Sequence, residues 1–378
     1  MTRSLLDITD FAPDEVALVL DLAQRRIADL GRPLDGQGAA LIFEKPSNRT
    51  RHSMEMAVFQ LGGHPVYTRG EEVGFDTREP VEDIAAIMSG YHGLIAARVF
   101  EHSVVERLAA AATIPVVNML SDWSHPLQGF ADALTMQQCL GDLTGKTVAY
   151  VGDWNNVSRS LSEIAAMLGM HVRIGCPPGF DADDAELERI LLLGAASVEQ
   201  FARPHDAITG AHAVHTDTWV SMGQEADKEA RRQAFEGFTV DADMMALADP
   251  AAVFMHCLPA YRGFEVAADV IDGPQSVVYQ QGHNRLHSAR GRRVPGRCPV
   301  SKVQRQQTIA RLIDTTVSSQ PQLVELLAAE GIAATQATVS RDLDDLGAVK
   351  VRVPGGNSVY AVPGSRPNGS HRSTSSDG

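Results

Sequence analysis

Short apolar runs alternate with amphipathic segments along most of the chain. The segments 51–60, 81–89 and 160–168 have apolar residues at helical spacing. The apolar runs are nearly continuous, which is typical of strands buried on both faces. They predict strands at residues 39–43, 93–97, 115–118, 147–151, 171–175, 213–216 and 252–256. Buried strands that alternate with helices indicate parallel sheets covered by helices on both sides.

The predicted strands form two series. A predicted helix at 132–140 joins them, and the segment 142–146 opens the second series. We therefore expect an α/β protein with two doubly wound parallel-sheet domains, at 1–137 and 138–290, and an interdomain cleft. Ligands of such sheets bind at the carboxyl ends of the strands.

The residue composition changes after residue 290. Residues 291–301 are rich in Gly, Pro and Arg and are typical of a linker. Three helical patterns follow at 302–313, 320–329 and 336–346, and then two strands at 349–353 and 359–362 flank the turn 354–357. This order predicts a winged helix-turn-helix over 302–363. The Ser- and Gly-rich tail 364–378 is predicted to be disordered.

Composition excludes several classes of protein. The chain has 378 residues, of which 44% are hydrophobic and 21% charged, as in ordinary globular proteins. A net charge of −14 argues against a protein that coats nucleic acid, although a local basic surface is compatible with it. Four widely spaced cysteines indicate neither a zinc site nor a disulfide framework. With no signal peptide pattern and no apolar run near the roughly 20 residues of a membrane span, we expect a cytoplasmic protein without membrane contact.

The string Ser47-Asn48-Arg49-Thr50-Arg51 carries the strongest chemical signal. It lies where a predicted strand ends and a helix begins. Unpaired N–H groups and the helix dipole favour an anion there. Hydroxyl, amide and guanidinium groups add donors suited to phosphate. A capped helix with solvated arginines is the alternative interpretation.

Other polar motifs follow further predicted strands. Arg98 and His125-Pro126-Leu127-Gln128 come after two strands of the first series. Asn155-Asn156, the stretch from Asp217 to Ser221-Met222-Gly223, and His256-Cys257-Leu258-Pro259 come after three strands of the second. Each motif alone fits a turn, a helix cap or simple packing, but together they predict one site at the carboxyl ends of the strands.

In order and spacing, these motifs closely resemble those of the aspartate/ornithine transcarbamylase family over residues 1–288. Asn-Asn, Asp-x-x-x-Ser-Met-Gly and His-Cys-Leu-Pro are similar to the ornithine branch. The resemblance implies a homotrimer without cofactor or metal. It implies that carbamoyl phosphate is bound by Ser47, Asn48, Arg49, Thr50, Arg98, His125, Gln128, Cys257, Leu258 and Arg285. It implies that L-ornithine is bound by Asn156, Asp217, Ser221 and Met222, and that Arg98, His125, Cys257 and Asp217 are catalytic.

The reaction implied is transfer of a carbamoyl group to the ornithine δ-amine, which gives L-citrulline and phosphate. Arg98, His125 and Thr50 would stabilise the oxyanion that forms as the neutral amine attacks. Proximity and charge stabilisation suffice for this step.

The sequence departs from the family pattern at several positions. Asn48 stands in place of Thr, Trp154 in place of a small residue, and Glu72 in place of Gln. The family also has a long apolar closing helix after Asn284-Arg285-Leu286-His287. The Gly/Arg/Pro segment stands in its place, so we expect that helix to be missing.

Residues 335–350 closely resemble the DNA-binding domain of bacterial arginine repressors. The resemblance implies that Gln336, Thr338, Ser340 and Arg341 face the major groove of DNA. Asp342, Asp344 and Asp345 oppose this electrostatically, and a helical unit without a DNA role is the alternative.

Two other functions compete with ornithine carbamoyl transfer. One is a DNA-binding regulator of arginine metabolism whose transcarbamylase part is degenerate. The other is a transcarbamylase for another amine such as putrescine.

Overall fold

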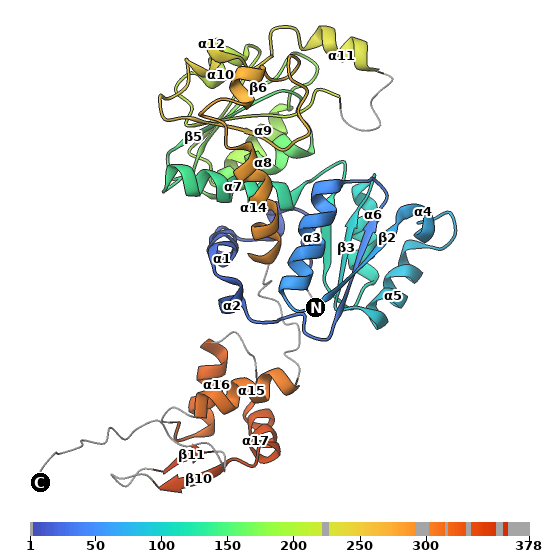
Figure 1. Ribbon diagram of the computed structural model, residues 1–378, viewed down its shortest axis with the longest axis vertical. Helices are drawn as coiled ribbons and strands as arrows, with labels where there is room; N and C mark the ends of the chain where they lie inside the picture. The colour runs from blue at the N-terminus through green and yellow to red at the C-terminus, as the bar shows by residue number, and fades with distance from the viewer. Residues whose placement is uncertain are drawn as a thin grey trace, which may run out of the picture. The chain divides into compact units, whose positions relative to one another are not determined.

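The computed structural model describes residues 3–220, 227–291, 302–313, 317–329, 334–352 and 358–361 (Figure 1). Contacts divide the chain into two units, which are described separately: Ser4–Arg293, and Val294–Gly378 together with Met1–Arg3. Within the described residues, every helix is too short or too polar to cross a membrane.

The first domain is built on a four-stranded parallel sheet in the order β2-β1-β3-β4. Its strands are β1 (Gly38–Phe43), β2 (His64–Arg69), β3 (Leu94–Arg98) and β4 (Val116–Leu120). Around it lie η1 (Ile8–Asp10), α1 (Pro13–Gln24), α2 (Ile27–Leu30), α3 (Asn48–Gln60), α4 (Gly70–Val73), α5 (Val81–Tyr91) and α6 (His102–Ala111).

Strand β1 shows why its sequence is continuously apolar. Leu41 and Phe43 belong to the hydrophobic cluster on one face of the sheet. Ala40 and Ile42 belong to the cluster on the other face. Since successive side chains point to opposite faces, both sets must be apolar.

The second domain contains a five-stranded parallel sheet in the order β7-β6-β5-β8-β9. Its strands are β5 (Thr147–Val151), β6 (His171–Gly175), β7 (Ser197–Phe201), β8 (Ala213–Thr216) and β9 (Val253–His256). Its helices are α8 (Asn156–Met167), α9 (Asp184–Leu192), α10 (Pro204–Ile208), α11 (Lys228–Ala234), α12 (Ala242–Met245) and α13 (Ala268–Ile271). The doubly wound architecture predicted from sequence is confirmed.

Two helices join the domains. Helix α7 (Pro126–Leu140) follows β4, and α14 (Val278–Gly291) packs on α7 and on α1 and α3 of the first domain. A Cβ at Gly291 would lie 2.5 Å from the Val19 carbonyl oxygen, so glycine permits this close approach. Ala289 belongs to the first domain's core, and Arg290 Nη1 donates to Gln60 Oε1 (3.0 Å). Thus the last turn of α14 packs back on the first domain. The segment 292–301, where the family's longer closing helix is expected to be missing, lies outside the described residues.

The C-terminal unit forms the predicted winged helix-turn-helix. It contains α15 (Lys302–Ile313), α16 (Gln320–Ala329) and α17 (Gln336–Asp345), and the antiparallel strands β10 (Val349–Arg352) and β11 (Ser358–Ala361). Apolar side chains of the three helices, among them Ile309, Leu323 and Val339, form its core. The predicted turn 354–357 and tail 364–378 lie outside the described residues.

Candidate functional site

The motif that begins at Ser47 caps a helix where strand β1 ends. Ser47 is the N-cap of α3, and its Oγ accepts a hydrogen bond from the Thr50 backbone N–H (3.3 Å). Asn48 is exposed in the first turn. The N–H groups of this first turn therefore lie at the carboxyl edge of the first sheet, where the sequence predicted an anion site.

Two buried arginines converge on Thr50. Arg98 ends β3 and Arg285 lies on α14, and their side chains approach the Thr50 hydroxyl at 3.5 and 3.1 Å. Arg285 Nη1 also donates to Gln128 Oε1 (2.6 Å). Burial lowers the pKa of each arginine to about 10. Both Nε atoms are buried and lack a hydrogen-bond partner among the described residues. Concentrated positive charge with spare donors is suited to an anionic ligand.

His125 lies beside this cluster as the N-cap of α7. Its backbone N–H donates to Ser160 Oγ of the second domain (2.9 Å). Burial, with the charges of Arg285 and Arg98, holds the His125 pKa well below its usual value. The imidazole is therefore neutral, and its buried Nδ1 has no hydrogen-bond partner among the described residues. A neutral imidazole can donate to a carbonyl oxygen through one nitrogen.

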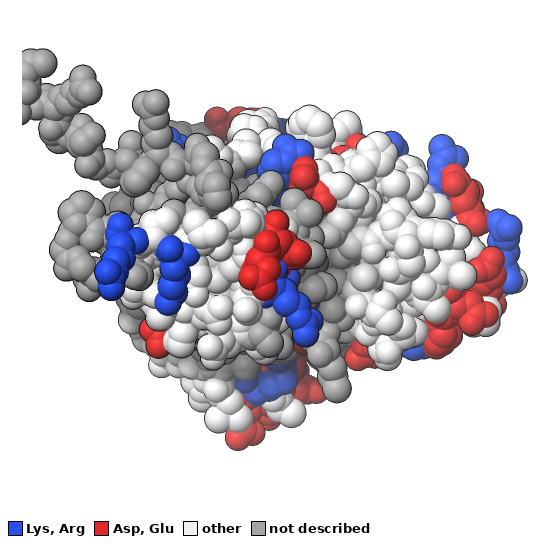
Figure 2. Space-filling model, turned by 90° about the horizontal axis from the view of Figure 1, so that it is seen from below, with Lys and Arg blue, Asp and Glu red and all other residues white. Residues whose placement is uncertain are grey.

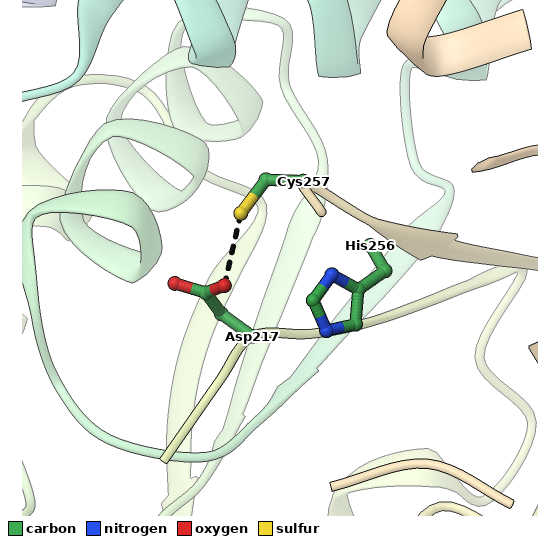
Figure 3. A group of neighbouring side chains, drawn as sticks. All are labelled: Asp217, His256 and Cys257. Atoms are coloured by element: carbon green, nitrogen blue, oxygen red, sulfur yellow. Dashed lines mark hydrogen bonds between the residues drawn. The ribbon is translucent and has the colours of Figure 1, made fainter. Parts of the chain in front are cut away.

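The second sheet contributes Asp217 and Cys257 (Figure 3). The Cys257 thiol donates to Asp217 Oδ1 (2.9 Å), and burial raises the pKa of both groups. His256 lies next to them, and ligand atoms of the three side chains lie within 4.8 Å of one another. However, His256 Nδ1 accepts from the Leu258 backbone N–H (2.8 Å), and its Nε2 lies 3.2 Å from Glu265 Oε1. A metal ion would have to displace one of these partners.

Contacts between the domains bring the two halves of the site together. Arg49 Nη2 donates to the carbonyl oxygen of Leu258 (2.6 Å). Residue Leu258 has a positive φ of 58° and is joined to Pro259 by a cis peptide bond. Asn156 Nδ2 donates to the Ser121 carbonyl oxygen after β4 (2.5 Å). Ser221 and Met222, which were predicted to bind ornithine, lie outside the described residues.

A buried polar network behind the site escaped the sequence analysis. Asp132 Oδ1 accepts hydrogen bonds from Gln128 Nε2 and Gln281 Nε2 (both 2.7 Å). Gln281 also lies 3.1 Å from His215 Nε2 and accepts from the His256 backbone N–H (2.9 Å). Burial raises the pKa of Asp132 to about 7 and lowers that of His215 to about 3. The signal available in the sequence was a carboxylate four residues after Gln128 on an otherwise apolar helix face.

Comparison with known proteins settles the family. Residues 3–138 match the model of the aspartate/ornithine carbamoyltransferase carbamoyl-P binding domain, and residues 144–291 match that of the Asp/Orn binding domain. The chain belongs to the aspartate/ornithine carbamoyltransferase family. In addition, residues 300–367 match the arginine repressor DNA binding domain.

The most similar curated relatives and solved structures have one name in common. Ornithine carbamoyltransferases of Thermus thermophilus and Acidothermus cellulolyticus are each 45% identical, over 77% of this chain and 95% of their own lengths. The crystal structure of the Thermus thermophilus protein has a TM-score of 0.70 and 42% identity over 77% of this chain and 97% of that one. The Pyrococcus furiosus structure has a TM-score of 0.72 and 41% identity over 76% and 95%.

The predicted DNA-contacting residues share helix α17, which is capped by Thr335. Gln336 and Arg341 are exposed. Thr338 and Ser340 are partly buried, and Ser340 Oγ accepts from Gln320 Nε2 (3.3 Å). The electrostatic objection raised by Asp342 is weaker than expected, because this carboxylate is buried and paired with Arg305. On the face drawn in Figure 2, acidic and basic side chains are interspersed.

Proposed function

We propose that this protein is an ornithine carbamoyltransferase, which transfers the carbamoyl group of carbamoyl phosphate to the δ-amine of L-ornithine. The observation that carries the proposal is the convergence of Arg98 and Arg285 on Thr50 beside the N-terminus of α3. Cys257 and Asp217 supply a second, carboxylate-bearing half of the site. The arginines of such a site suit an anionic carbamoyl donor, and its carboxylate suits an acceptor that carries an amine.

The phosphate group binds at the start of α3. Ser47, Asn48 and the backbone N–H groups of the first turn supply neutral donors, and Arg49 supplies charge. Arg49 also donates to the Leu258 carbonyl, so phosphate binding is coupled to the position of the His256–Pro259 segment of the second domain.

The carbonyl oxygen of carbamoyl phosphate faces Arg98, His125 and Thr50. Negative charge grows on this oxygen as the amine attacks, and donors that are already in place lower the barrier. Gln128 and Arg285 hold the carbamoyl end, and the hydrogen bond between them (2.6 Å) fixes their relative position.

L-Ornithine binds on the second-domain side. Asp217 contacts the δ-amine, Cys257 and Leu258 line the place where the amine meets the carbonyl carbon, and Asn156, Ser221 and Met222 hold the amino-acid head. The δ-amine attacks in its neutral form: its nitrogen forms a bond to the carbonyl carbon, and the bond from that carbon to the phosphate oxygen breaks. The proton that leaves the nitrogen passes to the departing phosphate, so the products are L-citrulline and phosphate.

The test is citrulline formation by the purified full-length protein with carbamoyl phosphate and L-ornithine. Steady turnover with L-ornithine and little with putrescine is the expected result. Faster turnover with putrescine would favour the transcarbamylase for another amine. A folded protein that binds DNA but forms no product would favour the regulator with a degenerate transcarbamylase part.

We propose that the protein is a cytoplasmic homotrimer. Met56 and Phe59 of α3 and Val66 of the edge strand β2 are exposed apolar side chains on the first domain, and such residues favour burial against another subunit. Sedimentation or light scattering of the full-length protein measures the oligomer directly.

DNA binding by the C-terminal unit is a second activity, supported by the repressor-domain match. Six basic and six acidic residues lie between positions 302 and 363, so one copy gives little net attraction to phosphate. Several copies on one oligomer would raise the effective concentration. Fluorescence anisotropy with duplex DNA at several salt concentrations tests this activity.

A further inference from the structure

Arg159 is partly buried and lies close to two tryptophans. Its guanidinium carbon lies 3.8 Å from the centre of the Trp123 ring and 5.7 Å from that of Trp154. Its Nη1 donates to the Trp123 carbonyl oxygen (3.3 Å), and its Nε donates to Glu186 Oε1 (2.7 Å). The side chains of Arg159 and Glu186 are only 14% and 12% exposed. A guanidinium that stacks on indole and pairs with a shielded carboxylate is held more firmly than a surface ion pair.

Two of the three residues lie in loops that carry site residues, and the third lies on the helix that follows one of these loops. Trp123 lies in the loop after β4 of the first domain, two residues before His125. Trp154 lies in the loop after β5 of the second domain, two residues before Asn156. Arg159 lies on the first turns of α8, directly after that loop. The cluster Trp123–Arg159–Trp154 therefore spans the two domains beside the proposed site.

A second contact joins the same two loops. Asn156 Nδ2 reaches the Ser121 carbonyl oxygen (2.5 Å), on the same loop as Trp123. The backbone of His125 is held separately, by Ser160 Oγ. Loss of the Arg159 contacts would therefore free the Asn156 side of the site more than the His125 side.

We infer that Arg159 is a positioning residue for the ornithine half of the site, with Trp123 as its platform. It holds the loop of Asn155 and Asn156 against the loop of Ser121 to Ser124. This inference rests on the proposed function. Without Arg159, the arrangement that accepts ornithine is populated a smaller fraction of the time, and the apparent affinity for ornithine falls in proportion to that fraction.

The experiment compares Arg159→Ala and Arg159→Lys with the unaltered protein in citrulline formation. For Arg159→Ala, KM for ornithine rises about tenfold, which corresponds to loss of a partly desolvated cation–π contact and a hydrogen bond. KM for carbamoyl phosphate and kcat change by less than about threefold, because His125 keeps its hydrogen bond to Ser160. Arg159→Lys retains part of the apparent affinity for ornithine that Arg159→Ala loses, since lysine keeps the charge but cannot stack a planar group on the indole.

A readout that does not depend on activity comes from fluorescence. The chain has three tryptophans in all, two of which flank Arg159, so Arg159→Ala changes the emission of the folded protein. Trp123→Leu raises KM for ornithine in the same way, and the double variant Arg159→Ala with Trp123→Leu is no worse than the worse single variant. Arg25→Ala, which removes an exposed arginine paired with Asp21, is the control and leaves all constants unchanged.

Two outcomes would overturn the inference. One is an unchanged KM for ornithine in folded Arg159→Ala. The other is an equal rise of KM for both substrates in Arg159→Ala, which Arg159→Lys does not reverse and which adds to the effect of Trp123→Leu in the double variant. That result would indicate a general role of Arg159 in folding. Failure of the proposed function is distinguishable, because the unaltered protein would then form no citrulline.

Discussion

The transcarbamylase unit and the winged-helix unit place their functional side chains in opposite ways. In the first unit Thr50, Arg98 and Arg285 meet although they are up to 235 residues apart, and all three are buried. In the second unit the predicted DNA-contacting residues share one helix of ten residues and are exposed or partly exposed. Function in the first unit therefore depends on the whole fold, whereas function in the second depends on one helix face and its surface charge.

Removal of one buried arginine tests this comparison most strongly. Arg98→Ala should lower kcat/KM by roughly 10² to 10³, the usual loss when one donor to a developing oxyanion is removed. Steady-state kinetics measures it, with Arg25→Ala as the matched exposed arginine. A loss below about tenfold would mean that Arg98 does not face the reacting carbonyl.

A charge change on the ornithine side should cost less. Asp217→Asn keeps an oxygen that can accept from the Cys257 thiol but loses the charge that attracts the amine. We expect kcat/KM for ornithine to fall roughly ten- to hundredfold, as for a hydrogen bond to a charged group. The Michaelis constant for carbamoyl phosphate should not change. Equal weakening of both substrates would place Asp217 elsewhere in the mechanism.

A single change on the winged helix should affect only DNA. Arg341→Ala should weaken DNA binding about tenfold and lower the slope of log affinity against log salt by about one if it contacts a phosphate. Citrulline formation by the same variant should be unchanged. DNA affinity equal to that of the unaltered protein would favour a helical unit without a DNA role.

The buried network gives a prediction about stability. The Asp132 pKa is raised from 3.8 to about 7 by burial, so its favourable contribution is complete below pH 3.8 and is lost as pH rises toward 7. Asp132→Asn keeps an acceptor for Gln128 and Gln281 and removes this titration. Its free energy of unfolding, relative to the unaltered protein, should rise between pH 5 and 7 by at most about 1.4 kcal/mol per pH unit. Urea unfolding at several pH values measures this, and parallel curves would contradict it.

The smallest effect is expected from removing the C-terminal unit. Because contacts separate Ser4–Arg293 from the rest, a chain that ends at Arg293 should form citrulline at a rate within about twofold of the full-length protein. Loss of activity in a folded, truncated protein would show that the enzyme depends on the winged helix.

The strands predicted from sequence are more buried than the strands that were not predicted. Strands β5, β6 and β8 begin and end at the predicted residues, and their apolar runs reflect packing on both faces. Strands β2 and β7 were missed. Both are edge strands with exposed or partly exposed positions, and Pro65, Glu199 and Gln200 interrupt their apolar pattern, so no buried run marks them.

The positions of candidate site residues were predictable from sequence where local hydrogen bonds within one motif fix the backbone. Ser47 to Thr50 cap a helix locally, so position in the sequence implies position in space. By contrast, the contacts of Arg49 with Leu258 and of Asp132 with Gln281 join segments more than 100 residues apart. Nothing in a single sequence pairs such residues, because only packing of the two domains brings them together.

Helix α14 also constrains how the protein is made. Ala289 is part of the core that contains Leu41 and Phe130 of the first domain. A nascent chain that has just completed α7 at Leu140 therefore waits for about 150 more residues before this core can close. At about 5 to 20 residues per second this takes roughly eight to thirty seconds. We expect the first domain to expose part of its apolar core during that interval, and that surface is one to which chaperones could bind.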